Sequence, residues 1–438
     1  MRKITCVAAI MAAITTPAFA ETEVQALKEQ IKLLEERLNK LESKPALTTV
    51  SDAVPANASV ASTTAKPTSL SNSFNPAIGV ILNGKYGQFS SDSSDFGGFA
   101  VGEEGERDSN GFSVEESELT FSSNIDDKFF GSLTAALVNE GGGTEVELEE
   151  AYLQTSAGLG LPDGLSIKAG RALWTLGYLN EHHAHSDDFA DRPLPYRTFL
   201  NHHFNDDGLE ASYVLPTSIY SEIGGGLFRG DDFPFGEADG KTFGAWSAFA
   251  RIGDDIGDNQ SWRIGAYILS GEADNRLANE DNIIFKGDAN IYAADLRYTY
   301  APTGNSQDQE VILQGEYFMR DEKGSYEDVA AATGAVNYDD SQSGWYAQGV
   351  YKFAPQWRVG ARYSQLYSAN APAGLAGTAL DANGHDPYSV SFMGDWTNSE
   401  FSRLRLQYNR EELAQEQDDN QFLFQYIMSI GAHPSHKF

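Results

Sequence analysis

Cysteine is almost absent from this chain. The single cysteine, Cys6, lies within the first 20 residues, which begin with a basic pair, continue with an apolar core over 4–14 and end in Ala-Phe-Ala. This order predicts a secretory signal peptide over residues 1–20. The exported chain would then contain no cysteine, which excludes a disulfide framework and a thiolate metal site.

Long apolar runs and basic residues are also scarce. Outside the first 20 residues, no stretch approaches the ~20 continuous apolar residues that a membrane-spanning helix needs. The chain has 31 lysines and arginines against 63 aspartates and glutamates, which gives a net charge of -32. A surface of this sign repels nucleic acid, so no nucleic-acid partner is expected.

Residues 21–43 have the pattern of a coiled coil. Apolar residues recur at alternating spacings of three and four among Glu, Lys and Gln, at Val24, Leu27, Ile31, Leu34, Leu38 and Leu41. This repeat predicts a short periplasmic coiled coil, or alternatively one amphipathic helix lying on another surface. Residues 44–75 are rich in Ser, Thr, Ala and Pro and predict a flexible linker.

From residue 76 to 438 the sequence consists of alternating segments separated by turn residues. The clearest is the segment from Gln421 to Ile430, where bulky apolar residues occupy every second position. We expect about sixteen strands, near 77–89, 112–124, 129–138, 146–156, 164–172, 206–215, 219–228, 243–253, 260–271, 288–300, 309–320, 343–353, 357–367, 387–397, 401–411 and 419–431.

The links between these strands are of two kinds. After every second strand the link is short and turn-like, whereas most of the others are longer, such as 90–111, 173–205, 321–342 and 368–386. This layout is typical of a single-chain outer-membrane barrel. The predicted fold is therefore all-β, a transmembrane antiparallel β-barrel with a water-filled lumen. Two segments, 112–124 and 146–156, switch the phase of their alternation, which indicates β-bulges.

One face of the C-terminal strands carries arginine. A charge facing lipid would cost about 2–4 kcal/mol at mid-membrane, so we expect this face to line the lumen. These arginines are either ordinary polar filling of the lumen or a positive wall that orients solutes and sets ion selectivity. They are Arg263, Arg297, Arg320, Arg358, Arg362, Arg403 and Arg405, and the last four are expected to form the wall opposite the third long loop.

The third long loop, residues 173–205, is expected to fold into the lumen and narrow it. It is rich in imidazole and carboxylate groups, which suit zinc and similar divalent ions. The candidate residues are His182, His183, His185, Asp187, Asp188, His202 and His203. The loop is either a metal-binding constriction or a polar loop that happens to be rich in histidine. No cofactor is required; weak Zn²⁺ or Ca²⁺ binding is the expected extent. Near the C-terminus, His433 and His436 are a further pair, expected at the periplasmic rim.

Several blocks resemble a known family. Glu149-Glu150-Ala151-Tyr152-Leu153 and Lys168-Ala169-Gly170-Arg171, after a coiled coil, resemble phosphate-selective outer-membrane porins. The blocks LGYLNEHHAHSDDFADRPLPYRTFL, DDGLEASYVLPT, GGGLFRGDDFPF and SIGAHPSHKF resemble proteobacterial outer-membrane proteins labelled zinc-regulated or TonB-dependent-receptor-like. The resemblance implies an outer-membrane transport protein with a link to zinc. Residues 21–75 are too few for the plug of a TonB-dependent receptor, so passive or facilitated passage is expected.

Taken together, the sequence predicts an outer-membrane porin for small hydrophilic solutes, with a link to divalent metal uptake. Expected partners are outer-membrane lipid and lipopolysaccharide, the barrel-assembly machinery through the C-terminal strand, peptidoglycan, and two further copies of the chain in a trimer. Two alternatives stay open: a ligand-gated receptor for a siderophore or metal chelate, and a structural tether of the envelope. No nucleophile motif stands out, so no enzymatic activity is expected.

Overall fold

The computed structural model describes residues 76–431, apart from residues 108, 141–142, 157–158 and 237–241. The predicted signal peptide, coiled coil and linker lie outside the described residues, as do His433 and His436. No helix in the described part of the chain is long and apolar enough to cross a membrane.

Strands make up most of the described chain. They are β1 (Ala77–Phe89), β2 (Gly111–Val114), β3 (Ser117–Asn124), β4 (Phe129–Glu140), β5 (Gly143–Thr155), β6 (Leu165–Leu173), β7 (Asn205–Val214), β8 (Tyr220–Phe228), β9 (Ala245–Asp255), β10 (Gln260–Ala278), β11 (Ile283–Tyr300), β12 (Glu310–Asp328), β13 (Val336–Ala354), β14 (Trp357–Tyr367), β15 (Tyr388–Ser399), β16 (Ser402–Ala414) and β17 (Gln417–Gly431). The described helices are short: η2 (Glu103–Gly105), η3 (Leu179–Glu181), η4 (Ala184–Ser186), α2 (Leu194–Leu200) and η5 (Ala373–Leu375).

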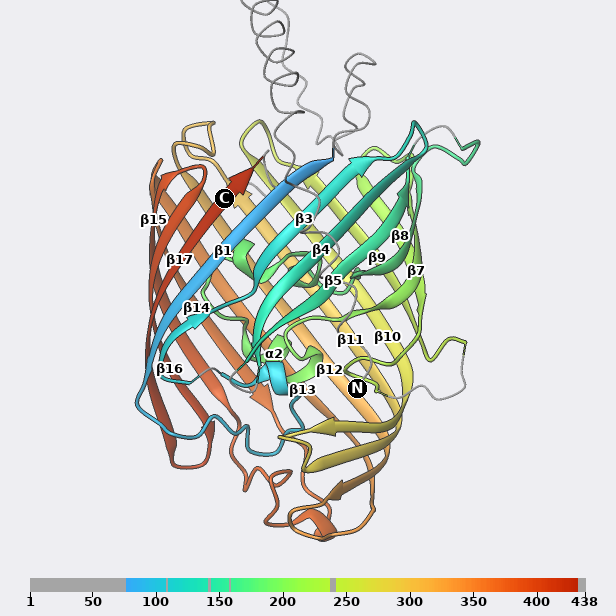
Figure 1. The fold of residues 1–438 in the computed structure, drawn as a ribbon, viewed down its shortest axis with the longest axis vertical. Helices are drawn as coiled ribbons and strands as arrows, with labels where there is room; N and C mark the ends of the chain where they lie inside the picture. Colours follow the sequence, from blue (N-terminus) through green and yellow to red (C-terminus); the bar gives the residue numbers. More distant parts are fainter. Residues whose placement is uncertain (1–75, 108, 141–142, 157–158, 237–241, 432–438) are drawn as a thin grey trace, which may run out of the picture. The chain divides into compact units, whose positions relative to one another are not determined.

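These strands close into one antiparallel barrel, which confirms the predicted fold (Figure 1). Strand β1 pairs with β17 from Gly79↔Gly431 to Phe89↔Gln421, and this seam joins the first stave to the last. Strands β2 and β3 both pair with β1 and are two halves of one stave, so the seventeen strands form sixteen staves. A closed barrel leaves no unpaired strand edge, as a structure surrounded by lipid requires.

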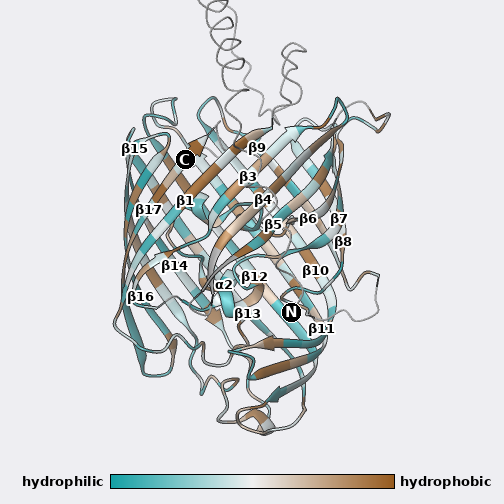
Figure 2. Cartoon of the chain, viewed as in Figure 1, coloured by the Kyte–Doolittle hydropathy of each residue, from teal (hydrophilic) through white to brown (hydrophobic). Residues whose placement is uncertain are grey.

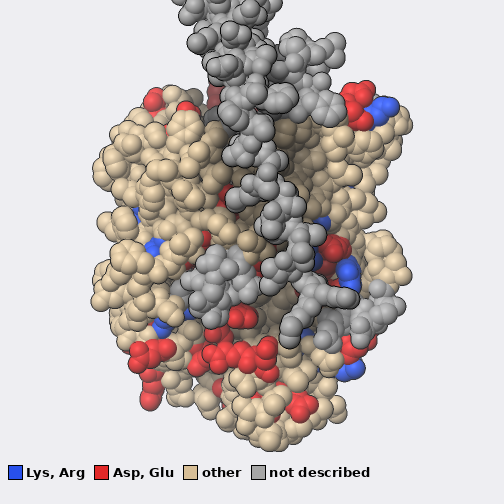
Figure 3. Space-filling view, in the orientation of Figure 1, with Lys and Arg blue, Asp and Glu red and all other residues tan. Residues whose placement is uncertain are grey.

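The two faces of the strands differ as the alternation predicts. On β17, Phe422, Phe424 and Ile430 are exposed on the outer surface, whereas the intervening Gln421 and Gln425 are buried inside. Figure 2 shows the resulting mixture of apolar and polar positions along the staves, and in Figure 3 the upper left part of the visible wall is mostly tan. An apolar outer band around a polar interior is the arrangement that a barrel in lipid needs.

The two rims of the barrel carry different links. Short turns lie at the rim where β1 begins and β17 ends, for example residues 355–356 between β13 and β14. The opposite rim carries the long loops 90–110, 174–204 and 368–387, and acidic groups gather near it on the face shown in Figure 3.

The expected long loop over 321–342 is wrong in extent. Strand β12 continues to Asp328 and β13 starts at Val336, so only residues 329–335 link them. The backbone ladder persists from Tyr326↔Val336 onward, although the side chains there are largely polar. Ladder hydrogen bonds do not require apolar side chains, and for that reason alternation alone ends these strands too early.

Both phase switches are β-bulges, as predicted. The β1 partners change from Gly84↔Val114 to Val80↔Leu119, so the β2–β3 stave contains one extra residue. In the β4–β5 pair, Thr134↔Glu150 is followed by Ala135↔Leu148, which leaves Glu149 as the extra residue. A bulge lets two consecutive side chains share a face. Accordingly, Glu149 and Glu150 are both buried inside the barrel, while Leu148 is exposed outside.

Candidate functional site

The link between β6 and β7, residues 174–204 and here named L3, lies inside the barrel. It contains η3, η4 and α2. Proline at the start of α2 pre-sets the helical backbone, and the helix ends at Asn201, whose φ of 49° is left-handed. Every residue of α2 is buried, because L3 packs against lumen side chains and the first long loop.

The two legs of L3 are joined by the buried side chain of Asn180. Its Nδ2 donates to the carbonyl oxygens of Trp174 (2.7 Å) and Phe204 (3.0 Å), and its Oδ1 accepts from the Phe204 N–H at 2.6 Å. The indole N–H of Trp174 donates to the carbonyl of Asp206 at 2.8 Å. The base of the loop is therefore closed by hydrogen bonds between residues far apart in the loop.

On one side of the lumen, L3 meets a group of carboxylates on β3 and β5. His183 Nδ1 lies 2.9 Å from Glu149 Oε1, and its Nε2 lies 3.1 Å from Glu150 Oε2. His185 Nδ1 lies 2.6 Å from Glu118 Oε1, which is also 3.4 Å from His183 Nδ1. Burial alone would lower the pKa of His183, but Glu118 and Glu149 hold it well above its usual value. We name Glu118, Glu149, Glu150, His183 and His185 the acid–imidazole cluster.

A second group of contacts lies on β12 and β13. Glu316 accepts hydrogen bonds from the hydroxyls of Tyr196 (2.9 Å) and Tyr346 (2.5 Å) and from the backbone N–H of Tyr178 (2.8 Å). Tyr178 and Tyr196 belong to L3, whereas Tyr346 belongs to β13. One buried carboxylate therefore holds both a turn and the helix of the loop.

A third group joins the acidic part of L3 to arginines of the wall. Asp188 Oδ1 accepts from Arg358 Nη1 at 2.8 Å, and Asp191 Oδ1 accepts from Arg362 Nη2 at 2.6 Å. Burial raises the pKa of Asp188, but the Arg358 guanidinium outweighs it and holds the pKa below the usual range. For Asp187 burial dominates and raises the pKa to about 6, even though Arg192 lies beside it.

The arginines of the C-terminal strands were predicted to face L3 across open space, but they contact the loop directly. Arg358 and Arg362 pair directly with the loop, and Arg405 Nη2 donates to the backbone carbonyl of Asp187 at 2.7 Å. Arg403 donates to the same carbonyl at 3.3 Å. Opposite charges that are buried against one another attract more strongly than charges in open water, so the loop lies against these arginines.

L3 reaches from one side of the barrel to the other. His183 contacts Glu150 on β5, and Asp188 accepts a hydrogen bond from Gln348 on β13 at 3.3 Å. From β5 to β13 is eight steps in the pairing order of sixteen staves, which is half the circumference. The loop is therefore a bridge across the lumen with anchors at both ends.

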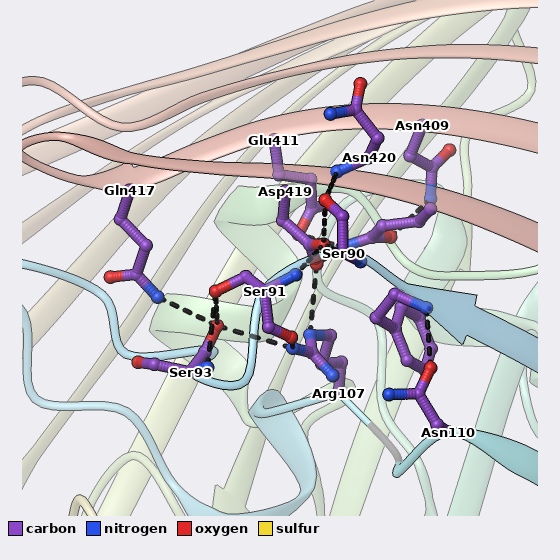
Figure 4. Close-up of polar contacts among 12 residues, drawn as sticks. Ser90, Ser91, Ser93, Arg107, Asn110, Asn409, Glu411, Gln417, Asp419 and Asn420 are labelled. Carbon is purple, nitrogen blue, oxygen red and sulfur yellow. Dashed lines mark hydrogen bonds and ion pairs between the residues drawn. The ribbon is translucent and has the colours of Figure 1, made fainter.

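The first long loop is tied to the seam strand β17 (Figure 4). Asp419 Oδ1 accepts from the backbone N–H groups of Ser90 (2.8 Å) and Ser91 (2.9 Å), and its Oδ2 lies 3.2 Å from Arg107 Nε. Gln421 links Asp419 to Glu411, each at 2.9 Å. Glu411 in turn accepts from Arg197 of α2 at 3.0 Å. A continuous polar network therefore connects the first loop, the seam and L3.

The other predicted residues are spread over the lumen. Arg263 and Arg297 lie over the ring of Tyr178, at 4.7 and 4.5 Å from its centroid. Arg320 is fully buried and lies 5.2 Å from the ring of Phe199. His182 Nδ1 lies 2.9 Å from the carbonyl oxygen of Tyr178, the residue on which its ring stacks.

The predicted histidines do not form one group. Burial and the nearby Arg197 lower the pKa of His202 to about 3, and burial lowers that of His203 to about 4. Both are therefore neutral at pH 7. The aspartates expected to share a metal with the histidines are engaged elsewhere, since Asp187 pairs with Arg192 at 2.7 Å and Asp188 with Arg358.

Sequence reasoning did not assign site roles to Glu118, Glu149, Glu150 and Glu316. Their partners in L3 lie 33 to 138 positions away in the chain, so local spacing gives no sign of the contact. One signal was present: the phase switch at Glu149 and Glu150 indicates two consecutive carboxylates on the inner face. Paired with the imidazole-rich loop, that switch could have identified the cluster.

The fold is that of the outer-membrane porins. Solved structures that share it include the trimer form of OmpT from Vibrio cholerae (12% identity, TM-score 0.51, 81% of this chain and 99% of that chain). The outer-membrane channel DcaP of Acinetobacter baumannii matches with 11% identity, a TM-score of 0.52, and coverage of 81% and 97%. An anion-selective porin from Comamonas acidovorans matches with 10% identity, a TM-score of 0.51, and coverage of 81% and 99%.

Sequence relatives add little about activity. No family model matches the chain. An uncharacterized protein of Aquifex aeolicus is 28% identical over 360 residues, which cover 78% of this chain and 73% of that protein. The structural likeness, at this level of identity, establishes the barrel architecture and not the solute.

Proposed function

We propose that the chain is an outer-membrane channel through which small hydrophilic solutes diffuse, with L3 as its constriction. The observation that carries this proposal is the bridge formed by L3 inside a sixteen-stave barrel whose inner face is polar and charged. A barrel of this size is wide enough for an aqueous channel, so its conductance depends on what fills the lumen. L3 makes the channel narrower than the barrel wall alone would.

The paired charges of the lumen support selection by field as well as by size. The arginines of β14 and β16 and the carboxylates of β3 and β5 lie on separate parts of the barrel wall. Separated charges of this kind create a field that orients dipolar solutes and sets ion preference. Which sign of ion is favoured depends on the groups that border the open path.

Assembly as a homotrimer is part of the same proposal. It is supported by the trimer form in which OmpT of Vibrio cholerae was solved. Location in the outer membrane is supported by the apolar outer band and the closed ladder. A link to metal uptake and the receptor alternative stay predictions. Asp187 pairs with Arg192 and Asp188 with Arg358, so these two carboxylates do not support a metal site in this part of L3.

The channel is tested by shortening L3. Replacing residues 182–200 with a short Gly-Ser linker removes the bridge and should raise single-channel conductance in planar bilayers, because the lumen is widened. Replacing residues 329–335 in the same way alters a link outside the bridge and should leave conductance unchanged. Folding of each variant is checked by heat-modifiable gel mobility. Absence of conductance from both the folded natural chain and its L3 variant would contradict the proposal.

A further inference from the structure

The acid–imidazole cluster has the geometry of a metal site. Oxygen atoms of Glu118 and Glu149 and a ring nitrogen of His183 all lie within 4.8 Å of one another. Ligand atoms bound to one zinc ion at about 2.0–2.2 Å are roughly 3–4 Å apart. The observed separations of 2.9 Å and 3.4 Å from His183 Nδ1 to the two carboxylates are therefore close to those of a coordinated set.

Two bulges in the barrel wall place these carboxylates on its inner face. The extra residue of the β2–β3 stave precedes Glu118, and Glu149 is itself the extra residue of β5. Without the second bulge, consecutive residues of β5 would point to opposite faces. Bulges frequently mark places where a strand re-aims side chains toward a site. L3 supplies the imidazoles from the lumen side, so three chain segments meet here.

Carboxyl groups outnumber imidazoles in this region. Glu116 lies beside Glu118 and Glu149 and interacts electrostatically with both. Three carboxylates, those of Glu118, Glu149 and Glu150, border two imidazoles, those of His183 and His185. The carboxyl group of Glu116 is hydrogen-bonded to that of Glu149. Oε2 of Glu149 is buried, and no cationic or amide group of the described residues donates to it. A metal ion can occupy such a position beside a buried carboxylate oxygen.

We propose that the acid–imidazole cluster binds one divalent transition-metal ion, with Glu118, Glu149 and His183 as ligands. Metal ligands bind in their deprotonated form, so binding displaces any proton held between His183 and the carboxylates. Mixed imidazole and carboxylate ligands suit Zn²⁺ and its neighbours in the first transition row, whereas Ca²⁺ and Mg²⁺ prefer oxygen ligands alone. Glu150 and His185 border the site and orient its ligands.

The ion would join β3, β5 and L3 at a single point. It would therefore fix one end of the bridge without lying on the arginine side of the lumen. This structural role differs from metal passage: the ion is a resident of the wall, and the proposal does not depend on which solute the channel carries.

Zinc binding to the full chain tests the proposal. The protein is purified in detergent without a histidine tag, stripped with a chelator and titrated with Zn²⁺ by calorimetry and equilibrium dialysis. One ion per chain is expected at this site, and excess Ca²⁺ or Mg²⁺ should not displace it. Glu149→Gln keeps the shape of the side chain and should weaken binding at least about tenfold, as should His183→Gln.

Two controls separate this site from other zinc ligands. His202→Gln alters a histidine of the same loop segment outside the cluster, and a His433→Ala, His436→Ala double variant removes the tail pair; both should bind as the natural chain does. X-ray absorption of the zinc-loaded chain should show nitrogen and oxygen ligands only. Failure to bind zinc, or binding unaffected by Glu149→Gln in a variant shown to be folded, would overturn the proposal. Loss of binding in the tail variant would do the same.

Discussion

Individual polar side chains decide where L3 sits, and Asn180 is the clearest case. Its amide makes three hydrogen bonds to backbone groups on both legs of the loop. A buried polar group that loses its partner costs about 1–3 kcal/mol, because bulk water cannot replace the bond. Without this side chain, the backbone carbonyls of Trp174 and Phe204 and the N–H of Phe204 would lose these hydrogen bonds.

We therefore expect Asn180→Ala to loosen the base of L3 without unfolding the barrel. Hydrogen–deuterium exchange should increase over 174–204, and trypsin should cut faster after Arg197. Asn305→Ala is the matched control, since Asn305 lies in an exposed turn where its side chain bonds only nearby residues. Equal exchange in L3 for the two variants would show that Asn180 does not hold the loop.

Strands follow from the sequence more readily than the site does. Period-two alternation identifies a strand that has lipid on one face and water on the other, and it located the staves and the bulges of β2–β3 and β5. The extensions of β10–β13 were missed because their outward positions are mostly polar, as at Lys286, Lys323 and Asp339, so the apolar alternation of the outer face stops there. Alternation also gives the face of a residue but not its partner. For that reason the inward position of Arg358 was predictable, whereas its contact with Asp188 was not.

The strand extensions provide a test of orientation in the membrane. The exported chain is expected to contain no cysteine, so single cysteines can be placed without background labelling. Asp340→Cys lies on β13 at the rim of the long loops, and Asn305→Cys lies in a turn at the opposite rim. An impermeant maleimide added to intact cells should label position 340 only.

After cell disruption, both positions should be labelled, since both side chains are exposed. We expect the rim of the long loops to face the cell exterior; labelling of position 305 but not 340 in intact cells would show that this rim faces the periplasm instead.

The stability of the whole molecule depends on apolar side chains that face lipid and polar side chains that face the lumen. Large apolar side chains are exposed around the outside, whereas charged and amide side chains are buried inside. In water this distribution would be unfavourable, because exposed apolar area favours association. The barrel is therefore stable as a unit only where lipid or detergent covers its outer band.

Neighbouring residues on β16 allow this balance to be measured. Leu406 is 65% exposed on the outer face, and a lysine there should destabilise the barrel in lipid by about 2–4 kcal/mol if it lies near the midplane. Gln407, on the inner face, donates to Asp191 at 2.5 Å, so a lysine there can pair with the same carboxylate. Urea titration in lipid vesicles, followed by heat-modifiable mobility, should show a large loss for Leu406→Lys and a small change for Gln407→Lys. Similar losses would mean that the outer face does not meet lipid.

The bulge at Glu149 has a consequence for how such a protein can change over generations. Because Glu149 is the extra residue of its strand, losing its codon would restore a regular ladder and leave Leu148 outside and Glu150 inside. A one-residue deletion elsewhere in a stave would reverse the faces of every following side chain. Loss of either the Glu149 or the Glu150 codon gives the same chain, so this in-frame deletion removes one carboxylate and spares the wall. Lineages could therefore lose or regain one of the two glutamate contacts with His183 in one genetic step.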